Sequence, residues 1–132
     1  VSEYEKFGRK FDLEVFSSIK GKAKLNMLHL HGENVMFDLL AAYPVEMINW
    51  HDRLTAPSLK IALNKFKGAV VGGVEERELL VSGGEQAVRA QVRDAIEQAG
   101  GRRLVVGPGC VAAIAAPAQN IRAVIDEARG GV

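Results

Sequence analysis

The order of apolar and polar positions along the chain predicts alternating helices and strands. Apolar residues recur every three or four positions, as along one face of a helix, in five segments: 2–20, 33–42, 55–66, 84–99 and a last segment that begins at Pro117. Short apolar runs of strand length lie between them, at 24–31, 45–50, 68–73 and 103–107. Thr55 is expected to cap the third helix, and Gly100-Gly101 to end the fourth.

This alternation predicts an α/β fold in which parallel strands are covered by helices. The expected order is one helix followed by four consecutive strand–helix units. Two architectures fit: an open doubly wound sheet, or part of a (β/α)₈ barrel. A complete barrel needs at least about 200 residues, so four units in 132 residues amount to half of one. We expect a single partial domain over residues 1–132.

Composition narrows the class of protein. A hydrophobic fraction of 48% and a charged fraction of 25% are ordinary for a globular protein. The net charge is +1 and the basic residues are scattered, which argues against nucleic acid as a main partner. The single cysteine excludes an internal disulfide and favours a cytoplasmic location. The most apolar run, 104–118, is too short to span a membrane. The chain begins with Val, so we expect a processed or trimmed piece.

Two histidines stand at the end of the first predicted strand, in the stretch LNMLHLHGEN. Alternate side chains of a strand share a face, so His29 and His31 lie on one side at its carboxyl end, where active sites of parallel α/β proteins lie. Cys110 follows the last predicted strand at the equivalent place. His29, His31 and Cys110 could bind Zn²⁺ and leave a fourth position open, as in catalytic zinc sites. Alternatively, the histidines are hydrogen-bonded structural residues and the cysteine is a small buried side chain.

Other polar residues follow the predicted strands. Asn49, His51 and Asp52 close the second strand, and His51 could be a general acid or base; a solvated loop is the alternative. Glu33 could be a first-turn acid that suits the helix dipole, or an extra metal ligand. Gly73, after the third strand, could let a ligand approach the backbone or could only make a turn. The acidic residues Glu75, Glu76 and Glu78 are expected to form a solvated face.

Five stretches together resemble the C-terminal half of the uroporphyrinogen decarboxylase superfamily: LHLHGEN, INWHD, VVGGVEERELL, GGRRLVVGPGC and APAQNIRAVIDEAR. The resemblance extends from about Tyr4 to Arg129. Its most specific part is Gly-Cys followed, seven residues after the cysteine, by Pro117 and then Asn120-Ile121 at a helix start. The resemblance implies the C-terminal half of a (β/α)₈ barrel.

Within this superfamily the resemblance favours the corrinoid-dependent methyltransferases. That branch has His-x-Cys on the fifth strand and Cys after the eighth, and these bind zinc, which activates an acceptor thiol for methyl transfer from a methylated corrinoid protein. True decarboxylases need no cofactor and have histidine where this chain has Cys110. The chain departs from the methyltransferase pattern at His31, where cysteine is usual.

Three functions are therefore compared. The first is a zinc-dependent methyltransferase, with His29, His31 and Cys110 as metal ligands, His51 and Glu33 as catalytic groups, and Asn49, Asp52 and Gly73 as cofactor-binding residues. The second is uroporphyrinogen decarboxylase itself, in porphyrin biosynthesis. The third is a non-catalytic half-barrel module that self-associates. In each case we expect pairing with a second copy or with the missing half-barrel, and no activity from this chain alone.

Overall fold

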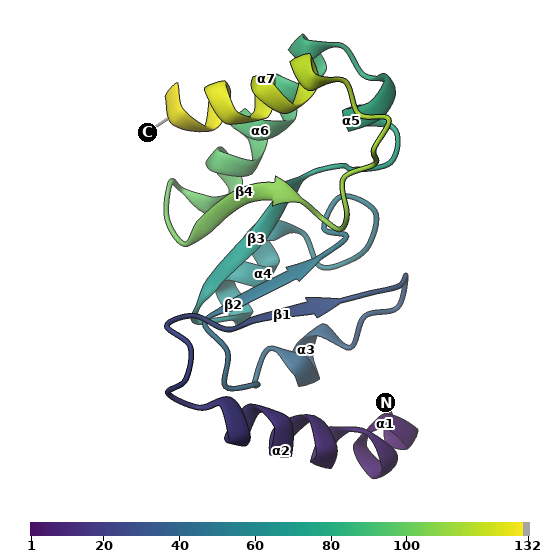
Figure 1. Ribbon diagram of the computed structural model, residues 1–132, viewed down its shortest axis with the longest axis vertical. Coiled ribbons are helices and arrows are strands. Elements are labelled where there is room, and N and C mark those ends of the chain that lie inside the picture. Colours follow the sequence, from purple (N-terminus) through teal and green to yellow (C-terminus); the bar gives the residue numbers. More distant parts are fainter. Residues whose placement is uncertain (131–132) are drawn as a thin grey trace.

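The computed structural model describes residues 1–130, and within them a four-stranded parallel sheet forms the centre of the molecule (Figure 1). Its strands are β1 (Met27–Leu30), β2 (Met47–Trp50), β3 (Ala69–Val74) and β4 (Leu104–Pro108), and they lie side by side in chain order. The register places His29 beside Asn49 and Asn49 beside Val71. The last two residues of the expected domain, 131–132, lie outside the described part.

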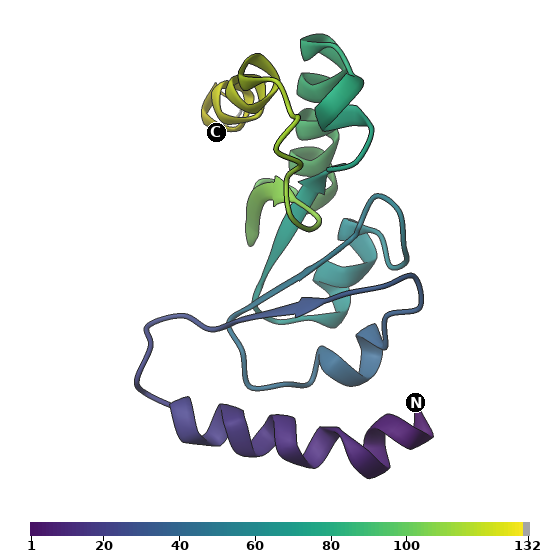
Figure 2. The same ribbon diagram turned by 45° about the vertical axis from the view of Figure 1, so that its right-hand side comes forward.

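The strand order decides between the two architectures that the sequence left open. A doubly wound sheet reverses its strand order at a switch point, whereas this sheet runs β1-β2-β3-β4 without reversal, as consecutive strands of a (β/α)₈ barrel do. Figure 2 shows the strand direction turning from β1 to β4, as expected of twisted strands. The expected α/β half-barrel, preceded by helical structure, is confirmed.

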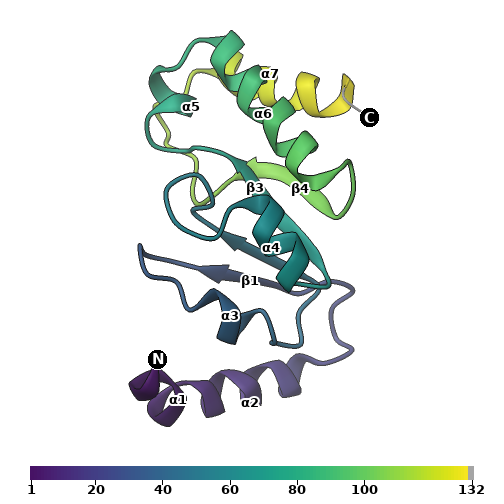
Figure 3. The same ribbon diagram turned by 180° about the vertical axis from the view of Figure 1, so that it is seen from behind.

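The helices between the strands lie on one face of the sheet, behind it in Figure 1 and in front of it in Figure 3. These helices are α3 (Phe37–Leu40), α4 (Leu59–Lys65), α5 (Leu79–Ser82) and α6 (Glu85–Ala99). Before β1 come α1 (Ser2–Phe7) and α2 (Arg9–Ile19), and after β4 comes α7 (Ala118–Gly130). On the opposite face Leu25, Met27 and Val105 are exposed. That face corresponds to the interior of a complete barrel.

The core lies between the sheet and its helices. From β2, Ile48 and Trp50 are fully buried, and from α6 Val88, Val92 and Ala95 are fully buried. Complete burial of one such aliphatic side chain contributes about 1.5–3 kcal/mol. The indole N–H of Trp50 donates to the carbonyl of Pro57, at 3.0 Å between nitrogen and oxygen, so this large side chain is buried with its donor satisfied. This packing fixes β2 and thereby the residues that follow it.

Several expected helix boundaries were wrong. The first helix is divided at Gly8 into α1 and α2, and the second is only the four residues of α3. Val35 and Met36 nevertheless pack against the core from the loop before α3, which explains why the apolar pattern resembled a longer helix. Thr55 does not cap α4, which starts after Ser58.

The fourth expected helix was correctly placed. The helix expected over 84–99 is α6, which ends at Gly100 in the left-handed conformation, with φ 61°. Among residues 1–130, no helix combines the length and the apolar content needed to cross a lipid bilayer.

Candidate metal centre

The two histidines at the end of β1 project from the open face of the sheet. His29 lies within β1 and His31 directly after it, so both follow the alternation that exposes Met27 and buries Leu30. Both imidazoles are exposed, and their ring centroids lie 5.9 Å apart. The strand pattern therefore places two imidazoles together at the carboxyl edge of the sheet.

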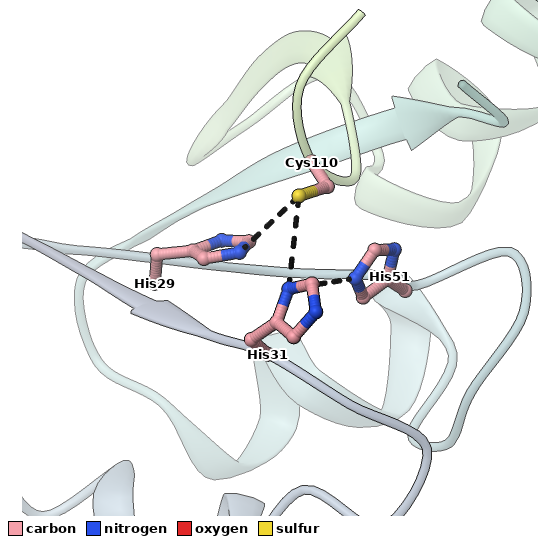
Figure 4. A group of neighbouring side chains, drawn as sticks. All are labelled: His29, His31, His51 and Cys110. Carbon is pink, nitrogen blue, oxygen red and sulfur yellow. Dashed lines mark hydrogen bonds between the residues drawn. The ribbon is translucent and has the colours of Figure 1, made fainter. Parts of the chain in front are cut away.

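Cys110 reaches these histidines from the loop after β4. Its Sγ lies 3.5 Å from His29 Nε2 and 3.8 Å from His31 Nδ1 (Figure 4). The preceding Gly109 makes this approach possible, because a Cβ there would lie 2.9 Å from both the Trp50 carbonyl oxygen and His51 Cα. The loop thus passes directly against the end of β2. The structure brings together the three residues predicted to bind zinc, although they are up to 81 positions apart in the chain.

His51 is a further member of this cluster. It follows β2, its residue is buried, and its Nε2 lies 3.4 Å from His31 Nδ1. The four potential ligand atoms of His29, His31, His51 and Cys110 all lie within 4.8 Å of one another. The sequence assigned His51 to acid–base chemistry; the structure adds that its Nε2 faces the same point as the other three donors (Figure 4).

The spacing of the donor atoms fits a tetrahedral metal. Zinc bonds of about 2.0–2.1 Å to nitrogen and about 2.3 Å to sulfur separate tetrahedral ligands by about 3.3–3.4 Å for two nitrogens and about 3.5–3.6 Å for nitrogen and sulfur. Among the three predicted ligands, the 3.5 Å from Cys110 to His29 matches the nitrogen–sulfur edge and the 3.8 Å from Cys110 to His31 is slightly longer. The 3.4 Å from His51 to His31 matches the nitrogen–nitrogen edge, so His51 also lies at ligand distance. Imidazole and thiolate are also the ligand types that zinc prefers. The residues present therefore fit zinc.

Glu76 forms a hydrogen bond with His51 through the ring nitrogen that does not face the cluster. Its Oε1 lies 2.5 Å from His51 Nδ1, and both side chains are almost fully buried, with 3% and 4% of their surface exposed. A carboxylate only accepts, so the Nδ1–H of His51 donates to it and leaves Nε2 free to face the cluster. This pair has the form in which metal-binding histidines are commonly oriented by a carboxylate.

The expected solvated acidic face was therefore wrong for two of its members. Glu75 is buried as well, and its carboxylate accepts from the backbone N–H groups of Arg77, Glu78 and Leu79. Burial acts to raise the pKa of Glu75, but these three donors outweigh it and lower the pKa below its usual value. The signal available in the sequence was position: Glu76 comes two residues after β3 and so lies at the same edge of the sheet as His31 and Cys110.

The predicted cofactor-binding residues have different surroundings. Asn49 contacts His29, with its Oδ1 2.5 Å from His29 Nδ1. Asp52 and Gly73 instead bind each other, because the backbone N–H of Gly73 donates to the buried carboxylate of Asp52 at 3.0 Å. Burial raises the pKa of Asp52 to about 6, against the opposing effects of the Gly73 N–H and the neighbouring guanidinium of Arg53. Their predicted role toward a cofactor stays a prediction.

Glu33 is not among the four clustered residues. It lies in the exposed loop before α3, not in the first turn of a helix, and its backbone carbonyl accepts from the Thr55 hydroxyl at 2.5 Å. Its predicted catalytic role stays a prediction that rests on its place in the loop after His31.

Comparisons with known proteins agree with the half-barrel fold. The model of the family described as uroporphyrinogen decarboxylase (URO-D) matches residues 1–130. Among solved structures, a methyltransferase from Methanosarcina mazei superposes with a TM-score of 0.80 at 23% identity. The match covers 98% of this chain and 37% of that one, so the chain spans little more than a third of the solved protein. A search of curated proteins found no significant match.

Proposed function

The chain belongs to the uroporphyrinogen decarboxylase family, and from that premise we propose that it is the C-terminal half-barrel of a zinc-dependent methyltransferase. The proposed reaction transfers a methyl group from a methylated corrinoid, carried by a partner protein, to a thiol or similar acceptor. The observation that supports this proposal is the convergence of three imidazoles and one thiol at the carboxyl edge of the sheet.

In this proposal His29 Nε2, His31 Nδ1 and Cys110 Sγ hold the zinc. Three protein ligands and one exchangeable position are the pattern of catalytic zinc sites. Zinc, when bound, lowers the pKa of a coordinated thiol and keeps it as a thiolate, the nucleophile that methyl transfer requires. The contribution of the chain is to bring donors from the ends of β1 and β4 close together.

We further propose that His51 is the general base for the acceptor thiol. Its Nε2 faces the cluster, so a thiol that enters the fourth position could pass its proton to this atom. The buried carboxylate of Glu76 would stabilise the imidazolium that results. Glu33, exposed in the loop after His31, is proposed to position the acceptor beside the cluster.

Cofactor-independent decarboxylation of a porphyrin precursor is the second candidate, and the description of the matching family favours it. The donor set argues against it, because a thiol and three imidazoles around one point suit a metal better than an acidic tetrapyrrole. A non-catalytic half-barrel is the third candidate. Both predict that the purified chain binds no stoichiometric metal, and the experiment below separates them from the methyltransferase.

The partner expected on structural grounds is a further half-barrel. Exposed apolar residues lie on α2 (Phe11 and Val15), the helix before β1, and on α7 (Ile121 and Ile125), the helix after β4, near the two ends of the molecule (Figure 1). Apolar faces of this kind, together with unpaired strand edges, favour association. We propose that the remaining strands of the barrel, or a second copy, pair there. The reduced thiol that zinc binding needs also supports a cytoplasmic location.

The experiment that tests the function is metal content by mass spectrometry of the purified chain. About one zinc per chain is expected from the proposed single site, and Cys110→Ser or His29→Ala should lose it. Two matched controls are Val111→Ser, at the highly exposed next residue, and Met27→Ala, on the same face of β1. Both controls should keep the zinc. A folded wild-type chain that holds none after metal-replete expression would contradict the methyltransferase proposal and favour the other two candidates.

A further inference from the structure

Asn49 lies beneath the metal centre and connects three strands. Its residue is 6% exposed, and it is the register neighbour of His29 on one side and of Val71 on the other. Its side chain points toward the open face that carries the cluster, because its strand neighbours Ile48 and Trp50 point into the core. The proposed reaction assigns no role to this buried polar side chain.

The surroundings determine which way its amide is turned. The Nδ2 atom lies 2.8 Å from the Val71 carbonyl oxygen and 3.2 Å from the Pro108 carbonyl oxygen. Carbonyl oxygens only accept, so the amide must present its two N–H donors to them. The amide oxygen Oδ1 is therefore the atom that faces His29 Nδ1, at 2.5 Å.

This orientation determines the tautomer of His29. An amide oxygen cannot donate, so His29 Nδ1 must carry the proton that forms this hydrogen bond. In the neutral ring Nε2 then has a free lone pair, and Nε2 is the atom that lies 3.5 Å from Cys110 Sγ. We propose that Asn49 is a positioning residue of this site, which holds His29 in the Nδ1-protonated tautomer and so presents Nε2 as the ligand.

The same side chain also fixes the second ligand. Pro108, whose carbonyl accepts from Asn49, lies two residues before Cys110 at the end of β4. One amide group therefore sets the tautomer of His29 and anchors the start of the loop that carries the thiol. The effect on metal binding rests on the proposed function, whereas the effect on the His29 tautomer does not.

The first test measures the tautomer in the metal-free chain by ¹⁵N NMR of the imidazoles, at a pH at which they are neutral. Wild-type His29 should be protonated at Nδ1. Asn49→Leu should shift it to the Nε2-protonated form, and Asn49→Asp, which keeps an acceptor but loses the two donors, should retain the Nδ1 proton. The control is Asn26→Leu, which removes an exposed side-chain contact to Glu46 at the opposite end of the sheet. An Nε2-protonated His29 in the wild-type chain would overturn the proposal, even if Asn49→Leu fails to fold.

The second test measures zinc affinity by competition with a chelating dye. Asn49→Leu should bind zinc about 10–100-fold more weakly, the usual effect of removing a group that orients a metal ligand, while Asn26→Leu should bind as the wild type does. Equal affinity in folded Asn49→Leu and wild type would contradict the positioning role. A wild-type chain that binds no zinc but has the expected tautomer would contradict the proposed function and leave the assignment of Asn49 intact.

Discussion

Replacement of Gly109 by alanine should weaken the proposed metal centre without removing a donor atom. A Cβ at this position would lie 2.9 Å from the Trp50 carbonyl oxygen and from His51 Cα, and 3.1 Å from Glu76 Oε2. Ordinary contact begins at 3.4 Å, so the two backbone contacts are short by half an ångström. Because β2 is fixed by the fully buried Trp50, the loop after β4 is the part that must move, and it carries Cys110.

The size of the effect follows from this shortfall. Overpacking of this kind costs about 1–3 kcal/mol of the free energy of unfolding. The groups of a binding site must be held within about 0.5 Å of their productive positions. A shift of Cys110 that reaches this limit should weaken metal binding by at least tenfold, or about 1.4 kcal/mol. The control is Gly107→Ala, since a Cβ at Gly107 would meet only Val71 Cγ1, at an ordinary 3.8 Å.

Two measurements check this prediction. Titration with Co²⁺ reports Cys110 through the thiolate-to-cobalt absorption band, and urea unfolding followed by the fluorescence of Trp50, the only tryptophan, reports stability. Wild type and Gly107→Ala should have equal cobalt affinity and equal stability to urea, and Gly109→Ala should have lower values of both. If Gly109→Ala binds cobalt as tightly as the wild type and unfolds at the same urea concentration, the reasoning from the close approach of the loop is refuted.

Two further predictions concern the buried acids after β3. Glu76→Gln should keep the fold and bind zinc as tightly as the wild type, because Glu76 contacts His51, the proposed base, and none of the three proposed ligands; chelator competition measures this, and a zinc affinity lowered about 10-fold would instead make His51 a fourth ligand that Glu76 orients. Glu75→Gln should lower the free energy of unfolding by about 2 kcal/mol at pH 7, because the charged acceptor of three N–H groups is lost. The folded-state pKa of Glu75 is lowered, so the stabilisation by its carboxylate is complete above the ordinary glutamate pKa of 4.5 and is lost as the pH falls through the folded-state pKa. The difference between the two proteins should therefore shrink in urea titrations at decreasing pH. A difference that stays constant from pH 7 to acid would contradict that assignment.

The sequence was sufficient for features that depend on strand position. The proximity of His29, His31 and Cys110 was predictable, because parallel strands end at one edge of a sheet and alternate side chains share a face. The helix α6 was also predictable, since it has a long apolar stripe and a glycine that ends it. Strand order was not predictable from the pattern, because alternating helices and strands suit both a doubly wound sheet and a barrel.

The remaining errors arise where tertiary contacts override local pattern. Glu76 reads as a solvated acid in a run of charges, and only the loop after β4, folded against it through Gly109, makes it a buried partner of His51. Val35 and Met36 have a helical spacing in the sequence, but they lie in a loop and pack against the core from there. The orientation of Asn49 depends on carbonyl groups 22 and 59 residues away in the chain, which no local pattern contains.

The donors of the cluster span the full width of the sheet, from the edge strand β1 to the opposite edge strand β4 (Figure 1). The separation between Cys110 and the two histidines therefore depends on how strongly the sheet curves, and closure into a complete barrel would set that curvature. By thermodynamic linkage, any additional half-barrel that tightens the metal centre must itself be bound more tightly when the metal is present. A metal ion at this edge would thus link the two edge strands of the sheet, and the affinity of the site for the metal would report whether the barrel is complete.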